Sequence, residues 1–255
     1  NKVVPAHIPI VGDCRPAIQW FNQQMRQDGS AVSDKERKEW LDQIGKWKSE
    51  APLSYGRSES IKPQSVIEKL HQLTNGNAIV ATEVGQNQIW AAHYYHIDRP
   101  NNFLTSGGLG TMGYGFPAAI GAQMAFPDRT VIDIAGDGSI QMNIQELATA
   151  VNYKLPVKIV ILNNGYLGMI RQWQELFYDK RYSNSKLSQT PDFVKVAEAY
   201  GAVGLRAEKP EEVEPTLRKG LETPGPVIMD FVVDSEEGVF PMVKPGFPLT
   251  DINLK

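Results

Sequence analysis

The segment 130–164 constrains the fold more than any other part of the sequence. It contains an apolar run at 130–135, a glycine turn, a helical pattern at 144–153 and a second continuous apolar run at 157–162. A strand that is apolar at most positions, as these runs are apart from Thr130, Asp133 and Lys158, is typical of one that is buried on both faces of a sheet. Two such strands joined by a helix predict a βαβ unit with parallel strands.

The same alternation of strands and helices continues on both sides of this unit. We expect helices at 14–29, 34–50, 61–74, 193–200 and 211–222, and further strands at 78–82 and 226–233. Strands that alternate with helices predict an α/β fold, a doubly wound parallel sheet covered on both faces. Ligands of such sheets bind beyond the carboxyl ends of the strands, so the residues just after each strand are the first candidates for a site.

The sequence divides into three expected parts. Residues 1–13 are interpreted as the end of a preceding domain, 14–60 as a helical linker that ends in a polar connector, and 61–255 as the main domain. The first residue is Asn1 rather than methionine, and residues 1–13 offer no partner for their own apolar runs. We therefore expect the chain to begin inside a longer protein.

Composition and charge exclude several classes of partner. The 26 basic and 29 acidic residues give a formal net charge of −3, so no basic excess indicates binding to nucleic acid. No apolar run approaches the roughly 18 residues that a membrane helix requires. The single cysteine, Cys14, allows neither an internal disulfide nor a thiolate metal site.

Polar residues follow both strands of the βαβ unit. Asp137 comes just after the first strand, and Asn163 and Asn164 follow the second. Neighbouring parallel strands would place these carboxylate and amide oxygens at the same edge of the sheet, and such hard oxygens suit Mg²⁺ with its phosphate ligands. Taken singly, each motif is typical of a turn. Their pairing across one βαβ unit favours a metal and phosphate site instead.

The glycines around Asp137 support a phosphate site. Gly136 and Gly138 allow the backbone to approach a bound group without an intervening Cβ atom. We expect the N–H groups of residues 139–141, at the start of the following helix, to face phosphate charge.

The G-D-G motif followed by N-N one βαβ unit later resembles the signature of thiamine diphosphate enzymes. This resemblance implies that Asp137, Asn164 and the main-chain carbonyl of Tyr166 bind Mg²⁺, and that the metal anchors the diphosphate. The segment 108–113 also fits G-x-G-x-x-G, but polar residues precede it where a dinucleotide-binding turn would follow an apolar strand. A dinucleotide site is therefore rejected.

Longer segments narrow the resemblance. The runs 83–92, 106–123, 167–183 and 239–249 are similar to the carboxy-terminal part of the large catalytic subunit in the acetohydroxyacid (acetolactate) synthase family. That family condenses pyruvate with pyruvate or 2-ketobutyrate, with loss of CO₂, in branched-chain amino-acid biosynthesis. The alternatives are another thiamine diphosphate enzyme, such as pyruvate oxidase or a 2-ketoacid decarboxylase, and a folded fragment without activity.

The resemblance also implies which residues contact the cofactor. They are Val84, Gly85, Gln86, Asn87, Gly110, Met112, Gly136, Gly138, Ser139, Asn164, Tyr166 and Leu167. Asn87 stands where many relatives have histidine. The Gly110 carbonyl would support the pyrimidine ring, Met112 would fill the space between the two rings, and Met169 and Trp173 would line the pocket for the second ketoacid. Core packing is the alternative for Met112, Met169 and Trp173.

The resemblance assigns no catalytic residue to this chain. The activating glutamate of the family belongs to an amino-terminal domain, and Glu83 is expected to be structural. The full-length protein would also bind FAD, form a homodimer or tetramer, and associate with a possible regulatory small subunit, in a bacterial cytoplasm or a eukaryotic organelle. We expect the 255 residues alone to bind the diphosphate weakly, to bind no FAD and to make no acetolactate.

Overall fold

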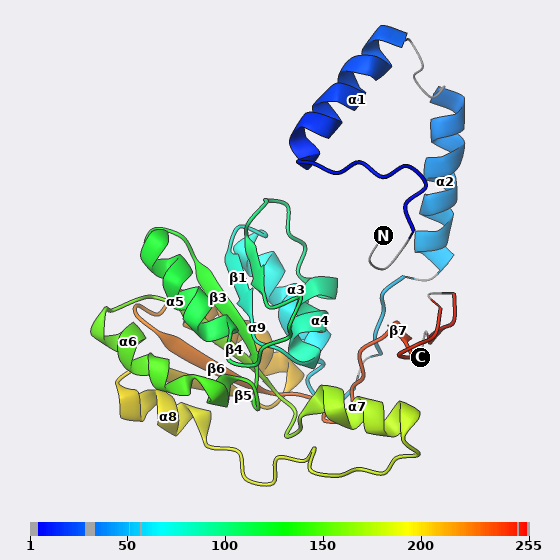
Figure 1. Cartoon of the computed structure of the whole chain (residues 1–255). Helices are drawn as coiled ribbons and strands as arrows, with labels where there is room; N and C mark the ends of the chain where they lie inside the picture. The colour runs from blue at the N-terminus through cyan, green and yellow to red at the C-terminus, as the bar shows by residue number, and fades with distance from the viewer. Residues whose placement is uncertain (1–4, 29–33, 51, 57, 249, 254–255) are drawn as a thin grey trace. The chain divides into compact units, whose positions relative to one another are not determined.

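The computed structural model describes residues 5–28, 34–50, 52–56, 58–248 and 250–253. The chain forms two compact units, one up to Leu53 and the other from Ser54 onward. The sequence interpretation had placed the end of the linker at residue 60. In Figure 1 the first unit is coloured blue, and the second runs from cyan through green and yellow to red.

The first unit contains two helices, α1 (Cys14–Asp28) and α2 (Asp34–Glu50), which agree with the predicted helical ranges. Aromatic side chains pair edge-to-face along each helix: Trp20 with Phe21, at a centroid distance of 5.3 Å, and Trp40 with Trp47, at 5.6 Å. The apolar run 8–11 forms no strand and is exposed, and Val3 and Val4 lie outside the described residues.

The second unit contains a six-stranded sheet in which every neighbouring pair is parallel, in the order β2-β1-β3-β4-β6-β5 (Figure 1). Its strands are β1 (Ile79–Thr82), β2 (Phe103–Thr105), β3 (Val131–Gly136), β4 (Lys158–Asn163), β5 (Val203–Ala207) and β6 (Val227–Val232). The predicted doubly wound parallel fold is confirmed.

Helices cover both faces of this sheet. One core contains side chains of α3 (Pro63–Thr74), α4 (Gln86–Tyr94) and α9 (Val213–Glu222), and the other contains side chains of α5 (Gly115–Ala125), α6 (Leu147–Asn152) and α8 (Phe193–Tyr200). Alternate residues of β3 enter the two cores: Ile132 and Ile134 the first, Val131 and Ala135 the second. The apolar runs are continuous because both faces of each central strand are buried.

Several elements differ from the sequence prediction. The expected helix 144–153 begins as the 3₁₀ helix η2 (Ile144–Glu146) and continues as α6, and a further 3₁₀ helix, η1 (Ile140–Met142), precedes it. The strands β2 and β5 were not predicted, because both lie at sheet edges and neither is a continuous buried apolar run.

The remaining elements complete the second unit. They are α7 (Gly168–Phe177), the 3₁₀ helix η3 (Pro210–Glu212), and the antiparallel pair β7 (Met242–Val243) and β8 (Ile252–Asn253). In the described part of the chain, no helix combines the length and the apolar character needed to cross a membrane.

Candidate functional site

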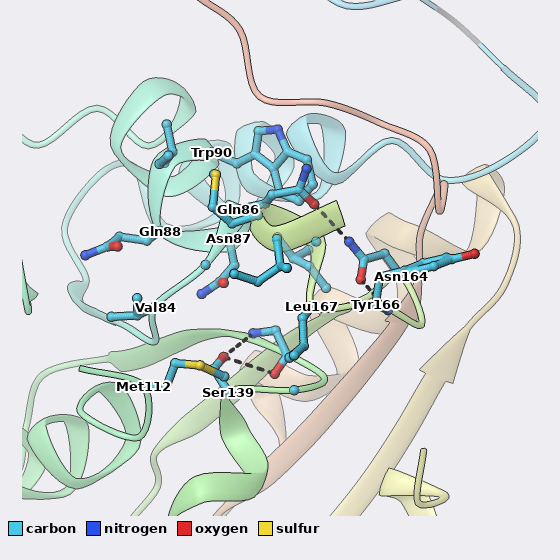
Figure 2. Close-up of a pocket in the computed structure, with 18 of the residues that line it drawn as sticks. Val84, Gln86, Asn87, Gln88, Trp90, Met112, Ser139, Asn164, Tyr166 and Leu167 are labelled. Carbon is cyan, nitrogen blue, oxygen red and sulfur yellow. Dashed lines mark hydrogen bonds between the residues drawn. The ribbon is translucent and has the colours of Figure 1, made fainter. Parts of the chain in front are cut away.

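The carboxyl ends of β1, β3 and β4 border the candidate site, a cavity of about 540 Å³ (Figure 2). Gly136 at the end of β3 pairs with Leu162 of β4, so the turns after the two strands begin at the same edge of the sheet. Every residue that the family resemblance assigned to a cofactor, a metal or a substrate pocket lines this cavity, whereas Ile140 and Gln141, whose N–H groups were expected to face phosphate, do not. Their roles toward a ligand stay predictions, but their convergence is a property of the fold.

Asp137 occupies the buried end of the cavity. Its side chain is 1% exposed, and its Oδ2 atom accepts a hydrogen bond from the backbone N–H of Gly165, at 3.0 Å. Burial raises the pKa of the Asp137 carboxyl to about 7, although backbone N–H groups oppose the shift. A cation beside this carboxylate would favour its ionised form.

Asn164 has its carboxamide orientation fixed by two hydrogen bonds (Figure 2). Its Nδ2 donates to Oε1 of Gln86, and its Oδ1 accepts from the backbone N–H of Tyr166, both at 3.0 Å. Gln86 is itself held, because its Nε2 donates to Oε1 of Gln172 at 2.8 Å. Gln86 therefore positions Asn164, a role that the sequence did not indicate.

The two adjacent asparagines have different surroundings. Asn163 donates its Nδ2 to Oδ1 of the buried Asp230, at 3.0 Å, whereas Asn164 lines the cavity. Only the second asparagine therefore remains as a candidate ligand.

The candidate metal ligands at this end of the cavity all offer oxygen atoms. The candidate donors are the Asp137 carboxylate, the Asn164 carboxamide oxygen and the Tyr166 carbonyl, all hard oxygen ligands of the kind that Mg²⁺ prefers. No group of three His, Cys, Asp or Glu residues that could hold a metal occurs among the described residues. A cation here would therefore need ligand phosphates or water to complete its coordination.

Glycines make the wall between the turns narrow. A Cβ atom on Gly138 would lie 2.7 Å from Leu167 Cδ2, and one on Gly168 would lie 2.0 Å from Gln86 Oε1. At Gly136 the closest atom would be Asn87 Oδ1, at 3.2 Å. Side chains at Gly138 and Gly168 would therefore clash with Leu167 and Gln86, two residues that line the cavity. The expected helix start at 139–141 is instead the three-residue η1.

The other end of the cavity is formed by an exposed loop before α5. Gly110 has a φ of +66°, and a Cβ built on it would lie 3.7 Å from Val84 Cγ1. Met112 points from this loop toward the phosphate end, since its Cε lies 4.0 Å from the position of a Gly138 Cβ (Figure 2). The loop and the strand-end turns thus face each other across the cavity.

Helix α7 supplies the outer wall. Met169 and Trp173 lie one turn apart, and both line the cavity. Trp173 is 38% exposed and packs edge-to-face on Phe177, at a centroid distance of 6.1 Å. It also lines a second cavity of about 440 Å³, which it shares with Ile170 and Arg181. Trp173 therefore separates two adjacent hollows.

The cavity also contains residues that the sequence did not single out. They are Gln88, Ile89, Trp90, Leu162, Gly168, Ile170, Met242 and Val243. Most of them fall within the segments used for the family resemblance, and this was the available signal. Glu83 does not line the cavity; its buried carboxylate binds the backbone N–H groups of Gly113 and Phe116, which agrees with the expected structural role.

Comparison with known proteins gives a consistent family. Residues 83–231 match the model of the thiamine pyrophosphate enzyme, C-terminal TPP binding domain. The chain is 48% identical over 246 residues to the acetolactate synthase isozyme 3 large subunit of Escherichia coli K12, covering 95% of this chain and 43% of that protein. It is 46% identical to the mitochondrial acetolactate synthase catalytic subunit of Saccharomyces cerevisiae, covering 98% of this chain and 36% of that protein. The chain thus spans less than half the length of these relatives.

Proposed function

Because the chain belongs to the thiamine pyrophosphate enzymes, through their carboxy-terminal cofactor-binding domain, we propose that its cavity binds thiamine diphosphate with Mg²⁺ and that it is the carboxy-terminal part of an acetolactate synthase large subunit. One observation carries the proposal for the cofactor. Asp137 and Asn164 follow neighbouring strands and line one glycine-walled cavity with Gly110 and Met112.

The residues of the chain would divide the binding between them. Asp137, Asn164 and the carbonyl of Tyr166 would hold Mg²⁺, which neutralises the diphosphate. The Gly110 carbonyl would orient the pyrimidine ring, and the Met112 thioether would fill the space beside it because its stem adapts to an irregular surface. Thiamine diphosphate itself supplies the electron sink that permits loss of CO₂ from a 2-ketoacid.

The wall of α7 supports a role in accepting the second 2-ketoacid. Met169 and Trp173 offer an apolar surface at the cavity, and Arg181 lines the adjoining hollow. An aromatic wall would distinguish acceptors by the apolar contact that an additional methyl group makes. Pyruvate and 2-ketobutyrate differ by one such carbon, so both are proposed substrates.

The names of the relatives favour the synthase over pyruvate oxidase or a 2-ketoacid decarboxylase. For the whole protein, we also propose that it binds FAD, forms a homodimer or tetramer and associates with a regulatory small subunit. None of these features is assigned to a residue of this chain. The activating glutamate is likewise expected from a domain outside these residues.

Product analysis tests the reaction. The chain would replace the matching segment of the E. coli isozyme 3 large subunit, and the hybrid would be incubated with pyruvate alone and with pyruvate plus 2-ketobutyrate. We expect 2-acetolactate in the first mixture and additional 2-aceto-2-hydroxybutyrate in the second. A hybrid carrying Asp137→Ala is the inactive control. Acetaldehyde or acetate as the main product would contradict the synthase assignment.

A further inference from the structure

Glu83 is a buried carboxylate that the proposed chemistry does not use. It follows β1, its side chain is 0% exposed, and its two oxygens bind different parts of one distant segment. Oε2 accepts from the backbone N–H of Gly113 at 2.6 Å, and Oε1 accepts from the backbone N–H of Phe116 at 3.0 Å. Hydrogen bonds to an ionised acceptor are about twice as strong as neutral ones.

These two N–H groups lie where the loop enters α5. The N-cap residue of α5, Tyr114, makes no side-chain cap, so the Glu83 carboxylate supplies the negative group that a helix amino terminus favours. Gly113 has a φ of +89°, and its carbonyl accepts from Asn143 Nδ2 at 2.6 Å. The residue next to Met112 is therefore held at both its N–H and its carbonyl.

A second buried acid lies against the same turn. Asp133 is 0% exposed, and neither of its carboxylate oxygens finds a hydrogen-bond partner among the residues that the structure describes. Its Oδ1 lies 2.3 Å from the position that a Cβ on Gly115 would occupy, and the Glu83 backbone nitrogen lies 2.5 Å from the same point. An ionised carboxylate without partners in such a site is very costly, so the neutral acid is favoured.

The two acids differ in what their surroundings stabilise. Burial, and then the charge of Glu83, raise the pKa of Asp133 well above its ordinary value. Burial also raises the pKa of Glu83, but backbone N–H groups of Phe116, Gly113 and Gly115 oppose that shift. The single negative charge of the pair therefore belongs on Glu83, where donors receive it.

We propose that Glu83 is a positioning residue that fixes Met112 and the Gly110 loop in the cavity by binding the backbone N–H groups of Gly113 and Phe116, with neutral Asp133 packed beneath. This inference deepens the proposed function and rests on it for the identity of the ligand. The hydrogen bonds of the Glu83 carboxylate go to the loop end of the cavity, at Gly113 and Phe116, whereas the candidate metal ligands belong to the turns after β3 and β4.

The matched variants are Glu83→Gln and Asp133→Asn. Glutamine keeps one acceptor oxygen but turns an NH₂ group toward an N–H donor. One of the two hydrogen bonds to Gly113 and Phe116 is therefore lost. Asparagine keeps the size of a neutral aspartic acid, so both hydrogen bonds of the Glu83 carboxylate remain. Amide hydrogen exchange is measured in the ligand-free chain, because this readout needs no cofactor. We expect at least about tenfold faster exchange at residues 110–116 in Glu83→Gln. In the same variant the amides of β6 should be unchanged, and Asp133→Asn should match the parent.

Binding of two ligands then shows which end of the cavity the Glu83→Gln substitution affects. Thiamine diphosphate with Mg²⁺ reaches both ends of the cavity, whereas inorganic pyrophosphate with Mg²⁺ reaches only the metal end. We expect Glu83→Gln to weaken binding of the first at least about tenfold and to leave binding of the second unchanged. Equal losses for both ligands would overturn the proposal.

The exchange data can also overturn it independently. Unchanged exchange at 110–116 in Glu83→Gln, or acceleration throughout the sheet, would show that Glu83 does not act on the loop specifically. If Glu83→Gln does not fold, Glu83→Asp serves instead, because it keeps the charge but is too short to reach both donors. A parent chain that binds no thiamine diphosphate would refute the proposed function. The exchange data of the ligand-free chain would still show whether Glu83 holds residues 110–116 in place.

Discussion

The two ends of the cavity are built in different ways. The metal end consists of buried turns that directly follow two paired central strands, and Asp137 and Asn164 are 1% and 8% exposed there. The loop end is a surface segment in which Leu109 is 94% exposed. That loop is bonded to the rest of the fold by Glu83 and Asn143, and a bond from the Thr111 N–H to Ser106 Oγ lies within the loop. Paired central strands thus set the positions at the metal end, whereas side-chain bonds from Glu83 and Asn143 hold the surface loop at the other end.

This difference predicts that substitutions at the two ends change different properties of the chain. A change at the metal end should remove ligand affinity while leaving the fold intact, because the backbone of the turns is set by the sheet. A change beneath the loop should affect stability and ligand affinity together, because the loop shares its contacts with the start of α5.

Asp137→Ala should have the largest effect on binding. The variant loses the only carboxylate proposed for the metal, so affinity for thiamine diphosphate with Mg²⁺ should fall at least about a hundredfold. Thermal denaturation with and without the ligand measures this, since a ligand stabilises only the form that it binds. Asp128→Ala, at an exposed position before β3, is the matched control and should keep the full ligand-induced shift. A normal shift in Asp137→Ala would refute the metal assignment.

Gly115→Ala should have the largest effect on stability. Its Cβ would lie 2.3 Å from Asp133 Oδ1 and 2.5 Å from the Glu83 backbone nitrogen, so backbone must move. Overpacking of this kind costs about 1–3 kcal/mol. Gly121→Ala, in the same helix but with nothing within 4 Å of its Cβ, should stabilise the chain by about 0.5–1 kcal/mol. Urea denaturation of both variants tests the contrast, and equal midpoints would contradict the packing described under the loop.

The sequence predicted the metal end better than the loop end for a physical reason. Asp137 and Asn164 belong to one βαβ unit, so strand periodicity and spacing alone placed them at one edge. The bond from Glu83 to Gly113 spans 30 residues and depends on how α5 packs on the sheet. Likewise, Gln86 could be linked to a cofactor by resemblance, but its bond to Asn164 requires the positions of two separate elements.

Secondary structure shows the same limit. The buried strands β3, β4 and β6 were predicted from continuous apolar runs, whereas the edge strands β2 and β5 were not. Edge strands are buried less completely, so their side chains carry a weaker pattern. The N–H groups of residues 139–141 were expected at a helix start, but the chain forms the short 3₁₀ helices η1 and η2 before α6 begins.

Trp173→Leu should have a smaller effect, and this effect should be on the choice of acceptor, because Trp173 lies in the α7 wall rather than at either end of the cavity. In the hybrid synthase, the preference for 2-ketobutyrate over pyruvate should decrease by about 1 kcal/mol, because an aromatic contact to one methyl group is lost. Pyruvate consumption should be retained. Competition between the two acceptors measures the product ratio, with Tyr153→Leu as an exposed aromatic control outside both cavities. An unchanged ratio in Trp173→Leu would remove this residue from the acceptor site.

The smallest expected effect is a change in pH dependence at the loop end. The pKa of Asp133 is raised in the folded chain, so its contribution to stability is present at low pH and is lost as the pH rises above the ordinary carboxyl value of about 4. Asp133→Asn has no such proton to lose. The melting temperature of the variant, relative to the parent, should therefore increase from pH 4 to pH 8. A difference in melting temperature that stays constant with pH would show that the pKa of Asp133 is not raised in the folded chain.

Titration calorimetry of the 255-residue chain tests the central claim most directly, which is that the strand-end turns recognise a diphosphate through a divalent cation. Four titrations are compared: thiamine diphosphate with Mg²⁺, thiamine diphosphate with a chelator, inorganic pyrophosphate with Mg²⁺, and thiamine without phosphate. We predict binding in the first and third, at least about tenfold weaker binding in the second, and none in the fourth. Equal affinity for thiamine, or affinity for thiamine diphosphate that the chelator leaves unchanged, would contradict the account.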